Sequence, residues 1–298
     1  MPRNFVPTIL RVLTYNVEWG FINLPKDITH DAGSHIIPNT MNAQYEHLKL
    51  IAKNIGLSSP HVCFMEEMGS INAVKYIADL LDKYYGLKYR IHYSGIGSGY
   101  QGIGALVHES INYYTSSVIE SFGLHRAFQI SFNGLTLIGL HAKSLGYGDH
   151  DENIRKQEAE MTSIINYING VLADNPEQDF LICGDFNNTR DSKPINIIND
   201  FVLKTPDSKR YERIIDLIDS DKYIENITGN RNTDFSRSSN GKERSSRIDY
   251  IWCNEKFADK CINCQIINFQ REYTGDKPNL NFRQESSDHL PVLAVFKL

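Results

Sequence analysis

The stretch LICGDFNN, residues 181–188, decides which fold we expect for this chain. It opens with a short apolar run, which is typical of a buried strand, and it ends abruptly in Asp185 and Asn187. Proteins of the α/β class place their sites at the sheet edge where polar residues end apolar strands. The stretch therefore predicts a core strand and marks the position of a candidate site.

The same pattern, an apolar run followed by a polar residue, recurs along the whole chain. Strand-like runs occupy residues 10–15, 61–65, 103–108, 111–119, 126–132, 135–140, 179–183, 248–253 and 291–296. The polar residues at their ends are Asn16, Glu67, His141, Asp185, Asn187, Asp249, Asp288 and His289. Solubility does not require so many charged and amide groups at strand ends, so we expect them to gather at one site.

Three helices are predicted between these strands, because their apolar residues recur with helical spacing. The helical faces are Leu48, Ile51, Ala52 and Ile55; Ile71, Val74, Ile77, Ala78 and Leu81; and Met161, Ile164, Ile165 and Ile168. Ser70 is placed to cap the second helix, and Gly170 to end the third. Asn133-Gly134 predicts a hairpin turn. With no internal repeat and no linker, we expect one mixed α/β domain over residues 1–298.

Composition excludes several classes of protein. Hydrophobic residues make up 41% of the 298 residues and charged residues 22%, values that exclude a disordered or fibrous chain. A net charge of −5 argues against a protein that coats nucleic acid by bulk positive charge. With no secretory pattern, no 18-residue apolar run and five sparse cysteines, we expect an intracellular protein, cytoplasmic or nuclear, without stable membrane association.

The strand-end residues suit the hydrolysis of phosphate esters. Carboxylates with amide oxygens are hard ligands that favour Mg²⁺ or Mn²⁺, whereas zinc would require more histidine or cysteine. Two histidines, His141 and His289, are candidates for acid–base work near neutral pH. Oxygen-ligated metal, histidine and an acid that orients it are the usual components of this chemistry.

Six short motifs, in order, resemble the endonuclease/exonuclease/phosphatase superfamily, the deoxyribonuclease-I-like phosphoesterases. They are TYN (14–16), EE (66–67), LHAKS (140–144), GDFN (184–187), RIDYIW (247–252) and SDHLPV (287–292). The resemblance implies a four-layer α/β sandwich, with two packed mixed β-sheets flanked by helices. It also implies hydrolysis by in-line attack of water with Mg²⁺, for which Mn²⁺ can substitute.

The same resemblance implies roles for the metal-binding and water-activating residues. Glu67 and Asp288 would bind the metal, and Asn16 would hold the metal or the scissile phosphate. Asp185 would orient or deprotonate the attacking water, while Asn187 would bind the phosphate. The motif PHVCFMEEM aligns Glu67 with the family's metal ligand, although a shift of one residue would select Glu66, which stands where the family commonly has Gln.

Further roles concern the phosphate and the leaving group. His289 would contact the phosphoryl oxygen or act as acid–base, oriented by Asp249, and His141 would stabilise the transition state or protonate the leaving group. Tyr100, in GYQGIG, would lie near the phosphate. Arg247 ends the basic segment 229–247, which is placed to contact a phosphate backbone.

The substrate that we expect is nucleic acid, DNA in the first place. Endonuclease and DNA-end-processing activities both stay open, as does RNA. The alternatives are a phosphoinositide phosphatase or a sphingomyelinase-type phosphodiesterase with the same residues. A catalytically inactive nucleic-acid-binding relative is the third reading, but such a relative should have lost site residues, and the motifs are all present.

Overall fold

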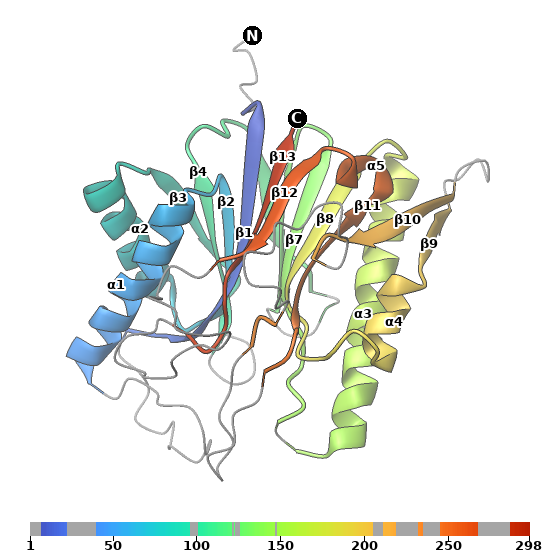
Figure 1. Ribbon diagram of the computed structural model, residues 1–298, viewed down its shortest axis with the longest axis horizontal. Helices are drawn as coiled ribbons and strands as arrows, with labels where there is room; N and C mark the ends of the chain where they lie inside the picture. The colour runs from blue at the N-terminus through green and yellow to red at the C-terminus, as the bar shows by residue number, and fades with distance from the viewer. Residues whose placement is uncertain are drawn as a thin grey trace.

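Two β-sheets pack face to face between helices in the computed structural model (Figure 1). The structure describes residues 7–22, 40–95, 101–120, 122, 126–146, 148–204, 211–218, 232–234, 245–267 and 287–298. In the described part of the chain, no helix combines the length and apolarity that crossing a bilayer requires.

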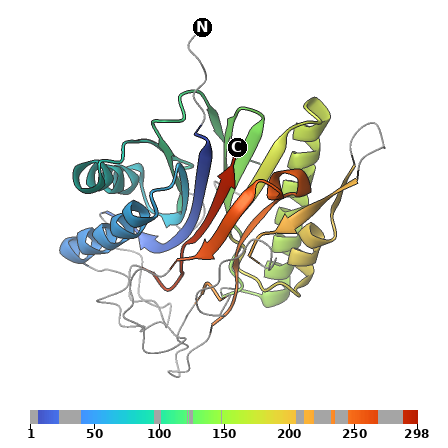
Figure 2. The same ribbon diagram turned by 45° about the horizontal axis from the view of Figure 1, so that its top comes forward.

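The first sheet has six strands, with α1 (Met41–Ser58) and α2 (Ile71–Tyr85) on its outer face. In spatial order its strands are β12 (Cys261–Ile266), β13 (Val292–Lys297), β1 (Ile9–Gly20), β2 (Val62–Met68), β4 (Gly102–His108) and β3 (Tyr89–Tyr93). Leu48 and Ile51 of α1 pack with Ile77 of α2 against Leu13 and Met65 of the sheet. Figure 2 shows both helices on the side of this sheet away from the second one.

The second sheet has seven strands and is covered by α3 (His150–Asp174) and α4 (Lys193–Asn199). Its order is β5 (Thr115–Val118), β6 (Ala127–Phe132), β7 (Leu135–His141), β8 (Asp179–Asp185), β11 (Asp249–Asn254), β10 (Tyr211–Asp216) and β9 (Val202–Lys204). Met161 and Ile165 of α3 pack on Trp252 of β11 and its neighbours. A four-residue helix, α5 (Glu255–Ala258), follows β11.

The core between the sheets follows from the alternation of side chains along each strand. In β2, Val62 and Phe64 face the second sheet, whereas Cys63 and Met65 face the helices. Leu181 of β8 meets Phe64 in the same inner cluster. Helices, sheet, sheet and helices form the four layers, so the predicted sandwich is confirmed.

Most predicted elements are present, with identifiable differences. Ser70 caps α2 by accepting the Ala73 N–H, and Asn133 and Gly134 form the hairpin turn with φ of 47° and 72°. The third helix passes Gly170 and ends at Asp174, because buried Leu172 extends its apolar face by another turn. The run at 111–119 is a strand only over 115–118. Six shorter elements, β3, α4, β9, β10, α5 and β12, were not predicted.

Candidate active site

Three of the predicted residues lie side by side on neighbouring strands of the seven-stranded sheet. His141, at the end of β7, is in parallel register with Asp185, at the end of β8. Asp249, the first residue of β11, is in antiparallel register with Asp185. Gly184 permits this arrangement, since it has a φ of 142° and a Cβ there would collide with the Leu140 carbonyl.

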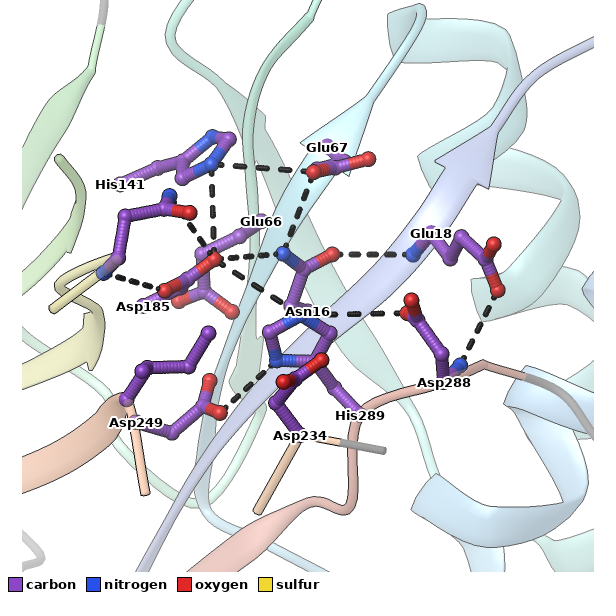
Figure 3. A network of polar contacts seen from close by, with 12 residues as sticks. Asn16, Glu18, Glu66, Glu67, His141, Asp185, Asp234, Asp249, Asp288 and His289 are labelled. Carbon is purple, nitrogen blue, oxygen red and sulfur yellow. Dashed lines mark hydrogen bonds and ion pairs between the residues drawn. The ribbon is translucent and has the colours of Figure 1, made fainter. Parts of the chain in front are cut away.

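The six-stranded sheet contributes Asn16 and Glu67 to the same site. Asn16 Nδ2 lies 2.9 Å from Asp185 Oδ2 and 3.3 Å from Glu67 Oε1, so one amide joins the two sheets. The β1–β2 register shifts after Asn16, and Glu67 has a φ of 63°. Such irregularities redirect side chains beside active sites. Here they direct the Glu67 carboxylate towards Asn16 (Figure 3).

His289 completes the cluster from the segment that leads into β13. Its Nδ1 lies 2.8 Å from Asp249 Oδ2 in a buried hydrogen bond, while Nε2 faces Asp185 and Asp288 at 3.9 Å each. Ser287 ties this segment to β1 by donating to the Asn16 carbonyl. Figure 3 shows His289, Asp249 and Asp185 converging between the two sheets.

The environment of Asp185 suits a group that accepts a proton near neutral pH. Burial raises its pKa to about 7; His289 opposes the rise and Asp249 adds to it. The carboxylate accepts the Asn187 N–H at 2.7 Å and its Nδ2–H at 3.1 Å, as well as the Asn16 amide. Asn187 also donates to the Ala142 carbonyl, so its contacts here position Asp185. Its predicted role in phosphate binding stays a prediction.

The two histidines are pushed towards opposite protonation states. Burial lowers the pKa of His289, but Asp249, Asp185 and Asp288 together raise it well above its usual range. Burial lowers the pKa of His141, and Arg126, His289 and Lys143 lower it further. These shifts favour the protonated form of His289 and the neutral form of His141. Groups whose pKa values are pushed apart in this way divide acid and base roles between them.

The oxygen atoms available at the site fit a hard divalent cation. Glu67 accepts the Trp19 N–H and the Gln101 side-chain amide, and its side chain is 18% exposed. Asp288, with Asp234 and His289, forms a cluster in which one potential ligand atom from each lies within 4.8 Å of the others. The carboxylate oxygens among these donors are the kind that Mg²⁺ and Mn²⁺ prefer. The ligand roles of Glu67 and Asp288 remain predictions that this donor set supports.

The contacts of Asn16 favour a bridging role over metal ligation. Its Oδ1 accepts the Glu18 N–H at 3.0 Å, and its Nδ2 contacts both Glu67 and Asp185. The oxygen that a metal would need is thus engaged with the backbone in this structure.

Glu66 and Glu67 lie in different environments. Glu66 is fully buried and accepts the Thr14 hydroxyl at 2.8 Å, while its Oε2 has no hydrogen-bond partner in the described part of the chain. Burial and the nearby Asp249 carboxylate raise its pKa well above the usual range. A neutral buried acid is a poor metal ligand, so the structure favours Glu67 for that role.

We expect Glu67→Gln to lower metal affinity and rate together, by about 10- to 100-fold in rate, because it removes a charged oxygen beside Asn16. Glu66→Gln is the matched control, one residue away, and should change the rate much less. Activity at varied Mg²⁺ concentration measures both effects. A larger loss in Glu66→Gln would show that the alignment of PHVCFMEEM is displaced by one residue.

Glu66→Gln should also change the pH dependence of stability. The folded pKa of Glu66 is raised above its unfolded value of about 4.3, so folding takes up a proton between these two pKa values. The contribution of Glu66 to the free energy of unfolding is therefore fully present below about pH 4.3. It decreases as pH rises, by at most about 1.4 kcal/mol per pH unit. Urea unfolding in EDTA should show the stability of Glu66→Gln increasing relative to that of the native protein as pH rises above about 5. Parallel pH curves for the two proteins would contradict a neutral Glu66.

One predicted substrate-binding residue, Arg247, is not brought into this cluster by any described contact. Arg247 Nη2 lies 2.9 Å from Asp216 Oδ2, and its guanidinium stacks over the Tyr250 ring. These contacts hold Arg247 beside β10 and give no support to a phosphate contact. Tyr100 lies outside the described residues, as do Arg231, Arg237, Lys242 and Arg244 of the basic segment.

Other residues that support the site were not selected from the sequence. Glu18 accepts the Asp288 N–H, Gln101 contacts Glu67, and Asp234 joins the acidic cluster. Gln157 of α3 is fully buried and donates to the Lys143 and Asn187 carbonyls. Four of the six described non-glycine residues with positive φ lie here, namely Glu18, Trp19, Glu67 and Asn187. Three of the supporting residues carried a sequence signal: Glu18 lies two residues from Asn16, Gln101 follows Tyr100, and Asp234 lies in the basic segment 229–247.

This fold, with its carboxylates, amides and paired histidines between two sheets, defines a metal-dependent phosphoester hydrolase. A family model described as the Endonuclease/Exonuclease/phosphatase family matches residues 13–289. The chain belongs to this family, and it is therefore a hydrolase of phosphate ester bonds. No curated protein sequence matches the chain significantly.

Solved structures of similar fold cover nearly the whole chain. Truncated Caenorhabditis elegans TDP2 has 17% identity and a TM-score of 0.57, with 97% of this chain and 98% of that chain covered. D. rerio TDP2 complexed with single strand DNA product has 16% identity and a TM-score of 0.57, with 98% and 100% covered. An AP endonuclease from Archaeoglobus fulgidus has 15% identity and a TM-score of 0.59, with 97% and 100% covered. At these identities the likeness shows the shared fold.

Proposed function

We propose that the chain is a Mg²⁺-dependent nuclease that hydrolyses phosphodiester bonds in DNA, as an endonuclease or in processing DNA ends. The observation that carries this proposal is the position of Asp185. It lies between the amides of Asn16 and Asn187, facing a charged His289 and a neutral His141. Such a group can activate water against a phosphodiester bond.

The similar structures support DNA as the substrate. One is of TDP2 complexed with a single strand DNA product, and another is of an AP endonuclease. Their fold covers almost all of this chain, so its site lies in the same architecture. By this proposal the phosphate backbone of DNA enters between the sheet edges where Asp185 and His289 meet.

The protein's own groups divide the reaction among them. Asp185 orients the attacking water and takes its proton, while the Asn16 and Asn187 amides hold the carboxylate in place. His289 donates from Nε2 to a phosphoryl oxygen, since its Nδ1 is held by Asp249. His141 points Nε2 into the same space, 3.7 Å from Asp185, where it stabilises the transition state by hydrogen bonding; its lowered pKa makes this imidazole unsuited to protonate the leaving group. A divalent cation held by Glu67 and Asp288 would neutralise phosphate charge.

A substrate panel tests the proposal. Supercoiled plasmid, an abasic duplex, 5′-phosphotyrosyl DNA, RNA, an inositol phosphate and sphingomyelin are incubated with the purified chain and Mg²⁺, with Mn²⁺, or with EDTA. Turnover of one or more DNA substrates with either metal, absent in EDTA and in an Asp185→Asn preparation, is the expected result. Turnover confined to the inositol phosphate or sphingomyelin would overturn the choice of DNA. Full turnover in EDTA would overturn the metal-dependent mechanism.

A further inference from the structure

Thr233 lies between the two partners of the Asp249–His289 pair and contacts the chain on both sides. Its side chain is fully buried. Oγ1 accepts the backbone N–H of Asp249 at 3.1 Å and that of Ile248 at 3.3 Å. The Thr233 carbonyl accepts the N–H of Leu290, the residue after His289, at 2.8 Å. One residue therefore binds the backbone next to both members of the pair.

Asp234 extends this connection. It forms isolated antiparallel bridges with Ser246 on one side and with His289 on the other. Its N–H donates to the Ser246 carbonyl at 3.0 Å, and the Ser246 N–H donates back at 3.0 Å. The Ser246 hydroxyl also donates to the Asp234 carboxylate. Residues 233–234 thus act as a short strand between the chain entering β11 and the chain entering β13.

This connection is needed because the pair spans the two sheets. Asp249 begins β11 of the seven-stranded sheet, whereas His289 precedes β13 of the six-stranded sheet. In the described residues β11 and β13 share no ladder, so no regular pairing fixes the 2.8 Å contact between the two side chains. The hydrogen bonds of residues 233–234 connect the chain that enters β11 with the chain that enters β13.

We propose that Thr233 is a positioning residue for phosphoester hydrolysis, which sets the relative placement of Asp249 and His289 through its hydroxyl and carbonyl. The inference rests on the roles of Asp249 and His289 in the proposed function. The hydroxyl is the part that only a side chain can supply, since any residue offers the carbonyl. Removing the hydroxyl should loosen the Asp249 side of the pair and leave the link to Leu290 in place.

Thr233→Val tests this inference, because valine keeps the shape of threonine without the acceptor. With bis(p-nitrophenyl) phosphate and Mg²⁺, kcat should fall about 10- to 100-fold, as expected when a catalytic group is displaced. KM should change less than about twofold, because ground-state binding is retained. Thr233→Ser keeps the hydroxyl and should restore kcat to within about threefold of the native value. Thr136→Val, the same change at a buried threonine whose hydroxyl contacts Ser131 and Gln178 at the far end of β7, is the matched control and should leave kcat unchanged.

A second comparison separates positioning from general stability. In a His289→Ala background, Thr233→Val should cost less than about twofold more in kcat, since groups acting as a unit are non-additive. An equal loss in both backgrounds, or a loss in Thr233→Val that Thr233→Ser shares, would overturn the inference. If Thr233→Val is not folded by circular dichroism, Thr233→Ala takes its place with the same expectations. Full activity of His289→Ala would contradict the proposed function itself, whereas an impaired His289→Ala beside a fully active Thr233→Val would contradict only the role of Thr233.

Discussion

Asp185→Asn should reduce kcat on the preferred substrate by at least about 10³-fold, the upper part of the range for a positioned acid–base group. The change removes a carboxylate that contacts both Asn16 and Asn187 and lies opposite both histidines. Asparagine has the same shape, so the protein should remain folded. Single-turnover rates on purified, folded variant measure the loss directly.

The pH profile gives the same prediction a second readout. As a base, Asp185 is active when deprotonated, so the rate should fall as pH falls through its pKa. Burial places that pKa at about 7, and a bound cation would lower it, which puts the acidic limb at or below about pH 7. Residual activity of Asp185→Asn should lack this limb.

Asp179→Asn is the matched control for Asp185→Asn. Asp179 is also a buried carboxylate, and it lies at the opposite end of the same strand, where it contacts Asn254 and Lys260. Its loss should leave kcat and the pH limb unchanged, even where it lowers thermal stability. Equal losses in the two variants would show that any buried charge change in β8 disables the protein, and the base assignment would then have to be withdrawn.

The parts of this structure that the sequence predicts are those with strong periodicity. Leu48, Ile51 and Ile55 repeat at helical spacing and pack as expected, and the apolar run 181–183 is a central strand. Short elements such as β9, with three residues, carry too little pattern for prediction. The third helix passes Gly170 because Leu172 is buried, and burial is a tertiary property that outweighs local propensity.

The residues of the site likewise divide into those that a local sequence pattern predicts and those that only the tertiary structure places. Residues at strand ends, such as His141 and Asp185, meet because register brings strand ends together. The separation of Glu66 from Glu67 depends on a backbone irregularity that two identical side chains do not reveal. Thr233 and Asp234 are tied to the site by hydrogen bonds across 12 or more positions, which no local pattern encodes. Arg247 was assigned to substrate from the basic segment and its place at the start of RIDY, whereas its ion pair with Asp216 depends on tertiary structure; its role in substrate binding stays a prediction.

Asp249→Asn and His289→Ala should each lower kcat by about 10²–10⁴-fold. The kcat of the double variant should be close to that of the more impaired single variant. The reason lies in the 2.8 Å contact between His289 Nδ1 and Asp249 Oδ2. Asp249 holds the ring so that Nε2 faces Asp185 and the incoming phosphate, and its charge keeps the imidazolium protonated. Without Asp249, burial would favour a neutral ring that donates poorly; without His289, Asp249 has nothing to orient.

A double-mutant cycle on kcat, with thermal unfolding of all four proteins as the control for folding, measures this coupling. Strict multiplication of the two single defects would mean that Asp249 and His289 act independently, and the assignment of Asp249 as the group that orients His289 would have to be dropped. Strong non-additivity would instead mean that the imidazolium acts only when Asp249 holds it. The action of His289 as an acid would then depend on its contact with Asp249, which joins the two sheets. A change that shifts one sheet relative to the other should therefore lower kcat before it unfolds the protein.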